Sequence, residues 1–128
     1  MSLPTPIQPA DLPAPRGHYS PGVRAGKLLF VSGQVPMQRD GTLALQADLA
    51  TQTRLCLSNL ESVLRAGDSS LDRVVKLTVF LAEADGWSTV NAAVAECFGA
   101  HRPARSVVPV PPFAAGFLVE IEAVAVVR

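Results

Sequence analysis

The sequence predicts a two-layer α+β domain whose strands and helices alternate in the order ββαβαββ. Two stretches carry apolar residues at helical spacing, whereas the remaining apolar stretches are short, rich in β-branched residues and alternating in polarity. The chain has 128 residues, 48% of them hydrophobic, which suits one domain with a single core. We therefore expect one domain over residues 1–128, with a mixed sheet packed by two helices.

The N-terminal part of the chain predicts an extended arm followed by a hairpin. Residues 1–17 are rich in proline and hold few large apolar side chains, which favours an arm on the surface. A short strand over 19–23 and a buried strand over 27–32 flank the Ala25-Gly26 turn. The two strands are expected to pair with each other.

The first helix is expected to begin near Asp48, a good N-cap residue, and to end at Gly67. A β-branched strand follows over 71–81, and a second helix opens at Asp85-Gly86 and closes before Pro103. The predicted terminal strands span 105–110 and 117–127. The last strand alternates, so that one face carries Glu120, Glu122, Val124 and Val126.

Composition and charge disfavour several classes of partner. The 11 basic residues balance the 11 acidic ones without forming a run, so nucleic-acid binding is not expected. The sequence shows no membrane span and no signal peptide, and the isolated Cys56 and Cys97 fit a reducing compartment, so we expect a cytoplasmic protein. With only His18 and His101 besides, these cysteines make no convincing metal site, and no metal or cofactor is expected.

Polar residues interrupt strands at places where the pattern predicts apolar ones. Ser32-Gly33-Gln34 ends a buried strand, either as a turn or as a backbone-lined ligand pocket. Arg105 enters a strand of valines, where it either forms an ion pair with Glu120 or Glu122 or binds an anionic ligand. The residues alone favour the turn for Ser32-Gly33-Gln34 and leave the two alternatives for Arg105 open.

A carboxylate such as Glu120 on an aliphatic strand can orient or deprotonate a water molecule. No Ser-His, Cys-His or lysine nucleophile accompanies Arg105 and Glu120, which favours water addition to an electrophilic carbon over covalent catalysis. Asn91 and Tyr19 are lesser candidates for ligand contact, and Trp87 is interpreted as a packing residue.

These stretches, in this order, resemble the Rid family, also called the YjgF type, over nearly the whole chain. Any one of them is weakly specific, but their joint order and spacing are characteristic. The matching segments are Gly17-His18-Tyr19-Ser20-Pro21, residues 26–34, Asn59-Leu60, residues 63–67, residues 74–81, Asn91, Phe98, Pro103-Ala104-Arg105-Ser106 and Val119-Glu120-Ile121-Glu122-Ala123.

The resemblance implies a chorismate-mutase-like fold, assembled as a homotrimer with pockets between subunits. It also implies a hydrolase that acts on C–N bonds, resembling 2-iminobutanoate/2-iminopropanoate deaminases, with a small carboxylic imine or enamine as its substrate. Arg105 would hold the substrate carboxylate and Glu120 would position the attacking water. The implied pocket residues are Tyr19, Ser32, Gly33, Asn91 and Val107.

Val107 departs from the family pattern, because many deaminase members carry Cys at this position. The change leaves the pocket without a thiol and bears on substrate range. A second class of function stays open, in which a trimer of the same fold binds a small carboxylic acid or a protein without turnover.

Overall fold

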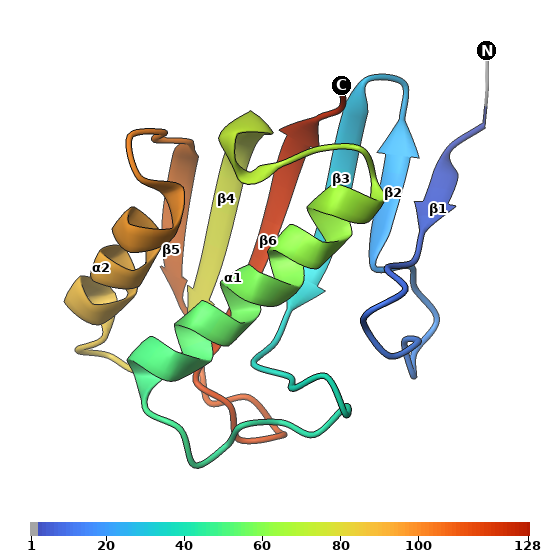
Figure 1. The fold of residues 1–128 in the computed structure, drawn as a ribbon. Helices are drawn as coiled ribbons and strands as arrows, with labels where there is room; N and C mark the ends of the chain where they lie inside the picture. Colours follow the sequence, from blue (N-terminus) through green and yellow to red (C-terminus); the bar gives the residue numbers. More distant parts are fainter. Residues whose placement is uncertain (1–2) are drawn as a thin grey trace.

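The computed structural model describes residues 3–128 as a mixed six-stranded sheet with two helices on one face (Figure 1). The sheet order is β1-β2-β3-β6-β4-β5, and only the β4–β5 pair is parallel. The elements are β1 (Thr5–Ile7), β2 (Gly22–Ala25), β3 (Leu28–Gln34), α1 (Leu49–Ala66), the 3₁₀ turn η1 (Leu71–Arg73), β4 (Val74–Leu81), α2 (Trp87–Phe98), β5 (Ala104–Pro109) and β6 (Val119–Val126).

Helix α1 begins and ends where the sequence predicts. The Asp48 carboxylate accepts a hydrogen bond from the Thr51 backbone N–H at 2.8 Å, which satisfies one of the free donors at the helix N-terminus. Gly67 ends the helix with its own N–H bonded to the carbonyl of Val63 at 3.0 Å. Both predicted termini of α1 are therefore confirmed.

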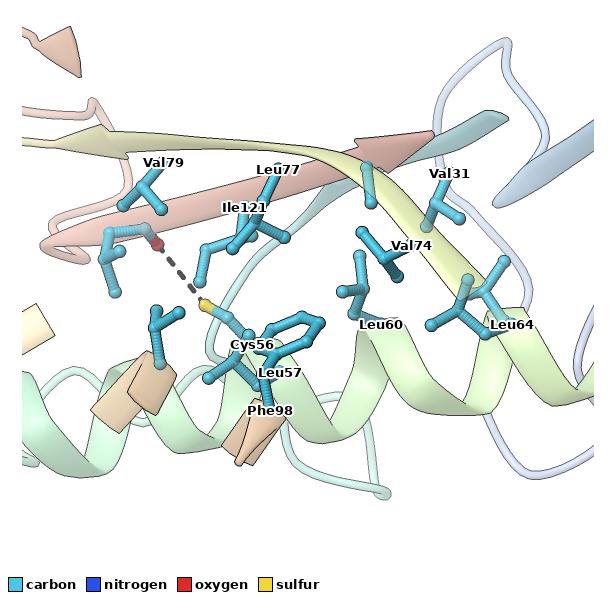
Figure 2. Close-up of a cluster of buried hydrophobic side chains, with 14 of the residues drawn as sticks. Val31, Cys56, Leu57, Leu60, Leu64, Val74, Leu77, Val79, Phe98 and Ile121 are labelled. Atoms are coloured by element: carbon cyan, nitrogen blue, oxygen red, sulfur yellow. Dashed lines mark hydrogen bonds between the residues drawn. The ribbon is translucent and has the colours of Figure 1, made fainter. Parts of the chain in front are cut away.

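The hydrophobic core lies between α1, α2 and the sheet. Figure 2 shows Leu57, Leu60 and Leu64 of α1 beneath the sheet residues Leu77 and Ile121. All five are at most 2% exposed. The Cys56 thiol donates to the Val119 carbonyl at 3.5 Å, so this cysteine is part of the core.

The N-terminal arm forms more regular structure than we predicted. Thr5–Ile7 pair antiparallel with β2 and add an edge strand, so the order of elements is βββαβαββ. Pro6 is compatible with this position, because an edge strand needs hydrogen-bond donors on one side only. Pairing with Leu28–Val31 places β2 at Gly22–Ala25, later in the chain than the predicted 19–23.

The strand predicted over 71–81 begins at Val74. Residues 71–73 form the 3₁₀ turn instead, because the Arg73 N–H bonds locally to the Ser70 carbonyl at 3.0 Å. A register shift between Val74 and Lys76 then breaks the predicted alternation, and leaves Val75 46% exposed. The terminal strands β5 and β6 differ from the prediction by at most two residues at each end.

The second face of the sheet carries no helix in the described part of the chain. On β6 the predicted alternation is confirmed, with Ile121 and Ala123 buried and Glu120 and Glu122 on the open face. On β3 the open face carries Leu28 and Phe30, which are 39% and 45% exposed. Neither helix within residues 3–128 combines the length and hydropathy needed to cross a membrane.

We predict that Leu60→Ala lowers the free energy of unfolding by about 2–5 kcal/mol, because it leaves a cavity at a fully buried position. Leu45→Ala is the matched control, since Leu45 is 42% exposed and its truncation should cost less than about 0.5 kcal/mol. Urea unfolding at one fixed protein concentration measures both. Equal losses in the two variants would contradict the described core.

Candidate active site

The Arg105 guanidinium is held at the edge of the sheet by two uncharged side chains. Its Nη1 donates to Asn91 Oδ1 at 2.9 Å, and its Cζ lies over the Trp87 ring, 5.4 Å from the ring centroid. Asn91 and Trp87 both lie on α2, and Arg105 lies on β5, which is an edge strand of the sheet. No ion pair joins Arg105 to a carboxylate within residues 3–128. The ion-pair interpretation of Arg105 is therefore wrong for the isolated chain.

Trp87 does not have the role that we predicted from the sequence. We expected a packing residue, but its side chain is 52% exposed and its ring meets Arg105. Trp87 and Asn91 are four residues apart on α2, so their side chains lie on the same side of the helix. The signal available in the sequence was this four-residue spacing, followed on the next predicted strand by Arg105, an arginine without an assigned partner.

A second group of predicted residues meets on the open face, around Gly33. A Cβ atom on Gly33 would lie 1.9 Å from Glu120 Oε2, so the carboxylate occupies the space that a side chain would take. The register of β3 against β6 shifts between Val31 and Gln34, which places Ser32 and Gly33 in an irregular segment. Gly33 is therefore required by the close approach of Glu120.

Ser32 and Gln34 satisfy backbone groups, as the turn interpretation predicts. The Ser32 hydroxyl donates to the Ser20 carbonyl at 2.6 Å, and Gln34 Nε2 donates to the Ser32 carbonyl at 3.0 Å. Tyr19 is 60% exposed and shares a cavity of about 230 Å³ with Gly33. The remaining walls of this cavity come from residues 12–16 of the arm, from Pro21, from Gln34 at the end of β3, and from Val35, Met37, Gly41 and Leu43 of the loop that follows.

Burial raises the pKa of the Glu120 carboxyl, and repulsion from Glu122 raises it further. Both effects disfavour the charged form of a carboxylate. Glu120 therefore binds protons at a higher pH than an exposed glutamate. Burial also raises the pKa of the nearby Cys56 thiol far above neutrality, so Cys56 stays protonated and is no nucleophile.

Within one chain, Arg105 and Glu120 lie on opposite faces of the sheet. Arg105 is paired with Leu77 of β4, whose side chain is buried under the helices. Glu120 is paired with Phe80, three residues further along β4, so its side chain points to the open face. The backbone positions of Arg105 and Glu120 are also separated by three residues along the strands, which is about 10 Å, and by two strand spacings across the sheet, which is again about 10 Å.

The predicted site residues thus form two groups instead of one. Arg105 and Asn91 border a cavity of about 520 Å³ along the C-terminal half of α2, whereas Gly33 and Glu120 meet on the open face, with Ser32 next to Gly33 in the chain. Val107 belongs to neither group, because it packs half-buried against the core. His101 also lines the larger cavity, and its Nε2 is 2.7 Å from the Val74 carbonyl.

Among the described residues, no group of three or more His, Cys, Asp or Glu side chains is arranged to hold a metal ion. The Arg105 guanidinium can bind a carboxylate, and the half-buried Glu120 carboxylate can accept and return a proton.

We predict that Glu122→Gln lowers the pKa of Glu120, because it removes the like charge on the same face. NMR titration of the Glu120 side-chain carboxyl measures the pKa directly. The exposed Glu83, which lies outside β6, provides the control variant Glu83→Gln, which should leave this pKa unchanged. An unchanged Glu120 pKa in Glu122→Gln would refute the described repulsion.

Comparisons with known proteins cover nearly the whole chain. The family model described as Endoribonuclease L-PSP matches residues 10–127. The 2-iminobutanoate/2-iminopropanoate deaminase of Escherichia coli K12 is 36% identical over 125 residues, which cover 95% of this chain and 97% of that protein.

Two E. coli crystal structures have the same fold. The YjgF gene product superposes with a TM-score of 0.89 at 35% identity, and TdcF with bound serine superposes with a TM-score of 0.89 at 32% identity. In both cases the match covers 97% of this chain and 99% of the other. The predicted resemblance and α+β fold are confirmed: the chain belongs to the Endoribonuclease L-PSP family, the YjgF or RutC type, which includes imine deaminases.

Proposed function

We propose that the protein hydrolyses 2-imino and enamine acids to 2-keto acids and ammonia. The observation that carries this proposal is the Arg105 guanidinium, which Asn91 and Trp87 hold in place without neutralising its charge. A guanidinium in this state is suited to bidentate binding of a ligand carboxylate. Two relatives support the proposal: one is named a 2-imino acid deaminase, and the other was crystallised with serine, which also carries an α-carboxylate.

The proposed site is shared between subunits of a homotrimer. A substrate of a few heavy atoms cannot contact Arg105 and Glu120 of the same chain, because the sheet lies between the two side chains. Arg105 of one chain and Glu120 of its neighbour would meet when the edge strand β5 docks against an adjacent open face. Such a contact joins different surfaces of two chains, and a closed ring of three satisfies it for every subunit. Burial of the exposed Leu28 and Phe30 would favour this assembly.

The proposed reaction is the addition of water to an imine. Arg105 holds the substrate carboxylate, and Glu120 takes a proton from water as the water oxygen forms its bond to C2. Glu120 passes this proton to the nitrogen, which gives a neutral carbinolamine. The proton of the carbinolamine hydroxyl is then transferred to the nitrogen through Glu120, the C–N bond breaks, and ammonia leaves while C2 becomes a carbonyl. Imines also hydrolyse in water without a catalyst, so correct placement plus general-base catalysis, typically worth about 10²–10⁴-fold, is sufficient.

The remaining predicted residues have supporting roles in this proposal. Tyr19 and Gly33, which share a cavity, would line the pocket with Glu120, which approaches Gly33, and Ser32 would support the adjacent backbone. Asn91 would orient Arg105. Val107, in place of the frequent Cys, would offer its backbone carbonyl to the site and no thiol, since its side chain packs against the core. The reaction needs no metal and no organic cofactor. A cytoplasmic location stays a prediction.

Ribonuclease activity, which the family description suggests, has less support in this chain. Formal net charge is zero at pH 7, so no general attraction to a polyanion operates. His101 lies within hydrogen-bond distance of a backbone carbonyl, and His18 is exposed in a distant part of the sequence. The site therefore offers no histidine pair for general acid–base cleavage of RNA.

We predict that Arg105→Ala reduces both substrate affinity and turnover, because the carboxylate loses its partner and its orientation. Arg105→Lys should restore only part of the loss, since an ammonium ion lacks the planar fork. Glu120→Gln should lower turnover by about 10²-fold or more while leaving carboxylate binding nearly intact. Imine hydrolysis can be followed with fresh amino-acid oxidase products, and circular dichroism verifies that each variant is folded. Full activity in Glu120→Gln would exclude the proposed mechanism.

Mixing subunits tests whether the site is shared. Arg105→Ala and Glu120→Gln chains, unfolded together in equal amounts and refolded, should regain up to about a quarter of wild-type activity, because random trimers contain some intact sites. Light scattering should give about three times the monomer mass of 13.5 kDa. If no activity is regained although the mixed trimers form, both residues must act from one chain, and a persistent monomer would exclude the assembly.

A further inference from the structure

We propose that Trp87 is a positioning residue for Arg105, and that its fluorescence reports directly on occupancy of the carboxylate site. This inference rests on the proposed function for the role of Arg105, but the contact between the two side chains is independent of turnover. The Arg105 Cζ lies 5.4 Å from the centroid of the Trp87 ring. A cation at this distance over an indole ring is attracted by the negative face of the ring.

Trp87 and Asn91 act on the same guanidinium in different ways. Asn91 Oδ1 accepts one hydrogen bond from Nη1, at 2.9 Å, which leaves the other guanidinium N–H groups available. The Trp87 ring uses none of these donors, so it restrains the guanidinium without competing with a ligand carboxylate. An arginine loses considerable rotamer freedom when it is fixed, and a site that restrains it beforehand spares the ligand part of that cost.

The exposure of Trp87 argues against a purely structural role. A tryptophan that is 52% exposed contributes little to the core, and Trp87 belongs neither to the hydrophobic core cluster nor to the half-buried side chains packed against it. Trp87 is the first residue of α2 and Asn91 follows one turn later, so both restraints come from one short, rigid segment. Replacement of Trp87 should therefore change the site while the fold persists.

The chain contains a single tryptophan, so intrinsic tryptophan fluorescence comes from Trp87 alone. We expect Arg105→Ala to change the emission maximum or lifetime of Trp87 even without ligand, because the charge beside the ring is removed. Arg54→Ala is the control, since Arg54 lies exposed on α1. Identical emission from wild type and Arg105→Ala would overturn the contact.

Pyruvate, a 2-keto acid of the proposed product class, serves as the probe for carboxylate binding. Its addition should change Trp87 emission in the wild type and leave the emission of Arg105→Ala unaffected. Trp87→Leu should weaken pyruvate binding, measured by calorimetry, by about two- to fivefold, and Trp87→Phe should remain closer to wild type, because a phenyl ring retains a weaker cation–π contact. In imine hydrolysis, the same variants should raise KM more than they lower kcat.

A double-variant comparison separates positioning from general packing. Trp87→Leu should have no further effect in an Arg105→Ala background, because a positioning residue acts only through the residue that it positions. The positioning role would be overturned if Trp87→Leu weakened pyruvate binding equally with and without Arg105. It would also be overturned if Trp87→Leu bound pyruvate as tightly as the wild type, or if the wild type did not bind pyruvate. Absence of imine hydrolysis in a wild type that binds pyruvate through Arg105 and Trp87 would refute the proposed reaction and leave the Trp87 inference standing.

Discussion

Strand β4 pairs with β5 on one side and with β6 on the other, and its alternating side chains determine which face each neighbouring residue occupies. Leu77 faces the helices and brings Arg105 to that side, while Phe80 faces away and brings Glu120 to the open side. A one-residue change of the offset would move buried residues such as Ile121 into solvent, because a strand alternates with a period of two. The backbone register therefore separates the two charged groups, and a site that uses both needs two chains.

The unequal coverage of the two faces provides the surface for such an association. Leu29 is fully buried, and Leu28, its neighbour on the same strand, is 39% exposed on the other side of the sheet. The free edges of the sheet are unsuited to continuous strand addition, since β1 has only three residues and β5 ends at Pro109. The proposed trimer would therefore form through faces and side chains more than by extension of the sheet.

Local chemistry explains which features could be predicted from the sequence. The Asp48 cap, the Gly67 stop and the alternation of β6 depend on residues near in sequence, so the pattern predicted them correctly. The β1 strand exists only because β2 offers it an edge, and the start of β4 depends on a local Arg73–Ser70 bond, so neither was visible in the pattern. The site residues show the same contrast between local and tertiary features. Motifs identified Arg105 and Glu120, but their placement on opposite faces and the contact between Trp87 and Arg105 depend on tertiary structure.

Separation of the two charges also preserves the chemical character of each. A guanidinium in direct contact with Glu120 would lower the pKa of the carboxyl and make it a weaker base, and the carboxylate would in turn occupy the donors that a ligand requires. In this chain the partners of Arg105 are an amide and an indole, which restrain it without neutralising it. Glu120 is surrounded instead by Gly33, by apolar neighbours and by Glu122, an environment that raises its pKa. A substrate carboxylate that neutralises Arg105 on binding would keep this difference intact in the assembled site, so that the base retains its raised pKa at the moment when water attacks.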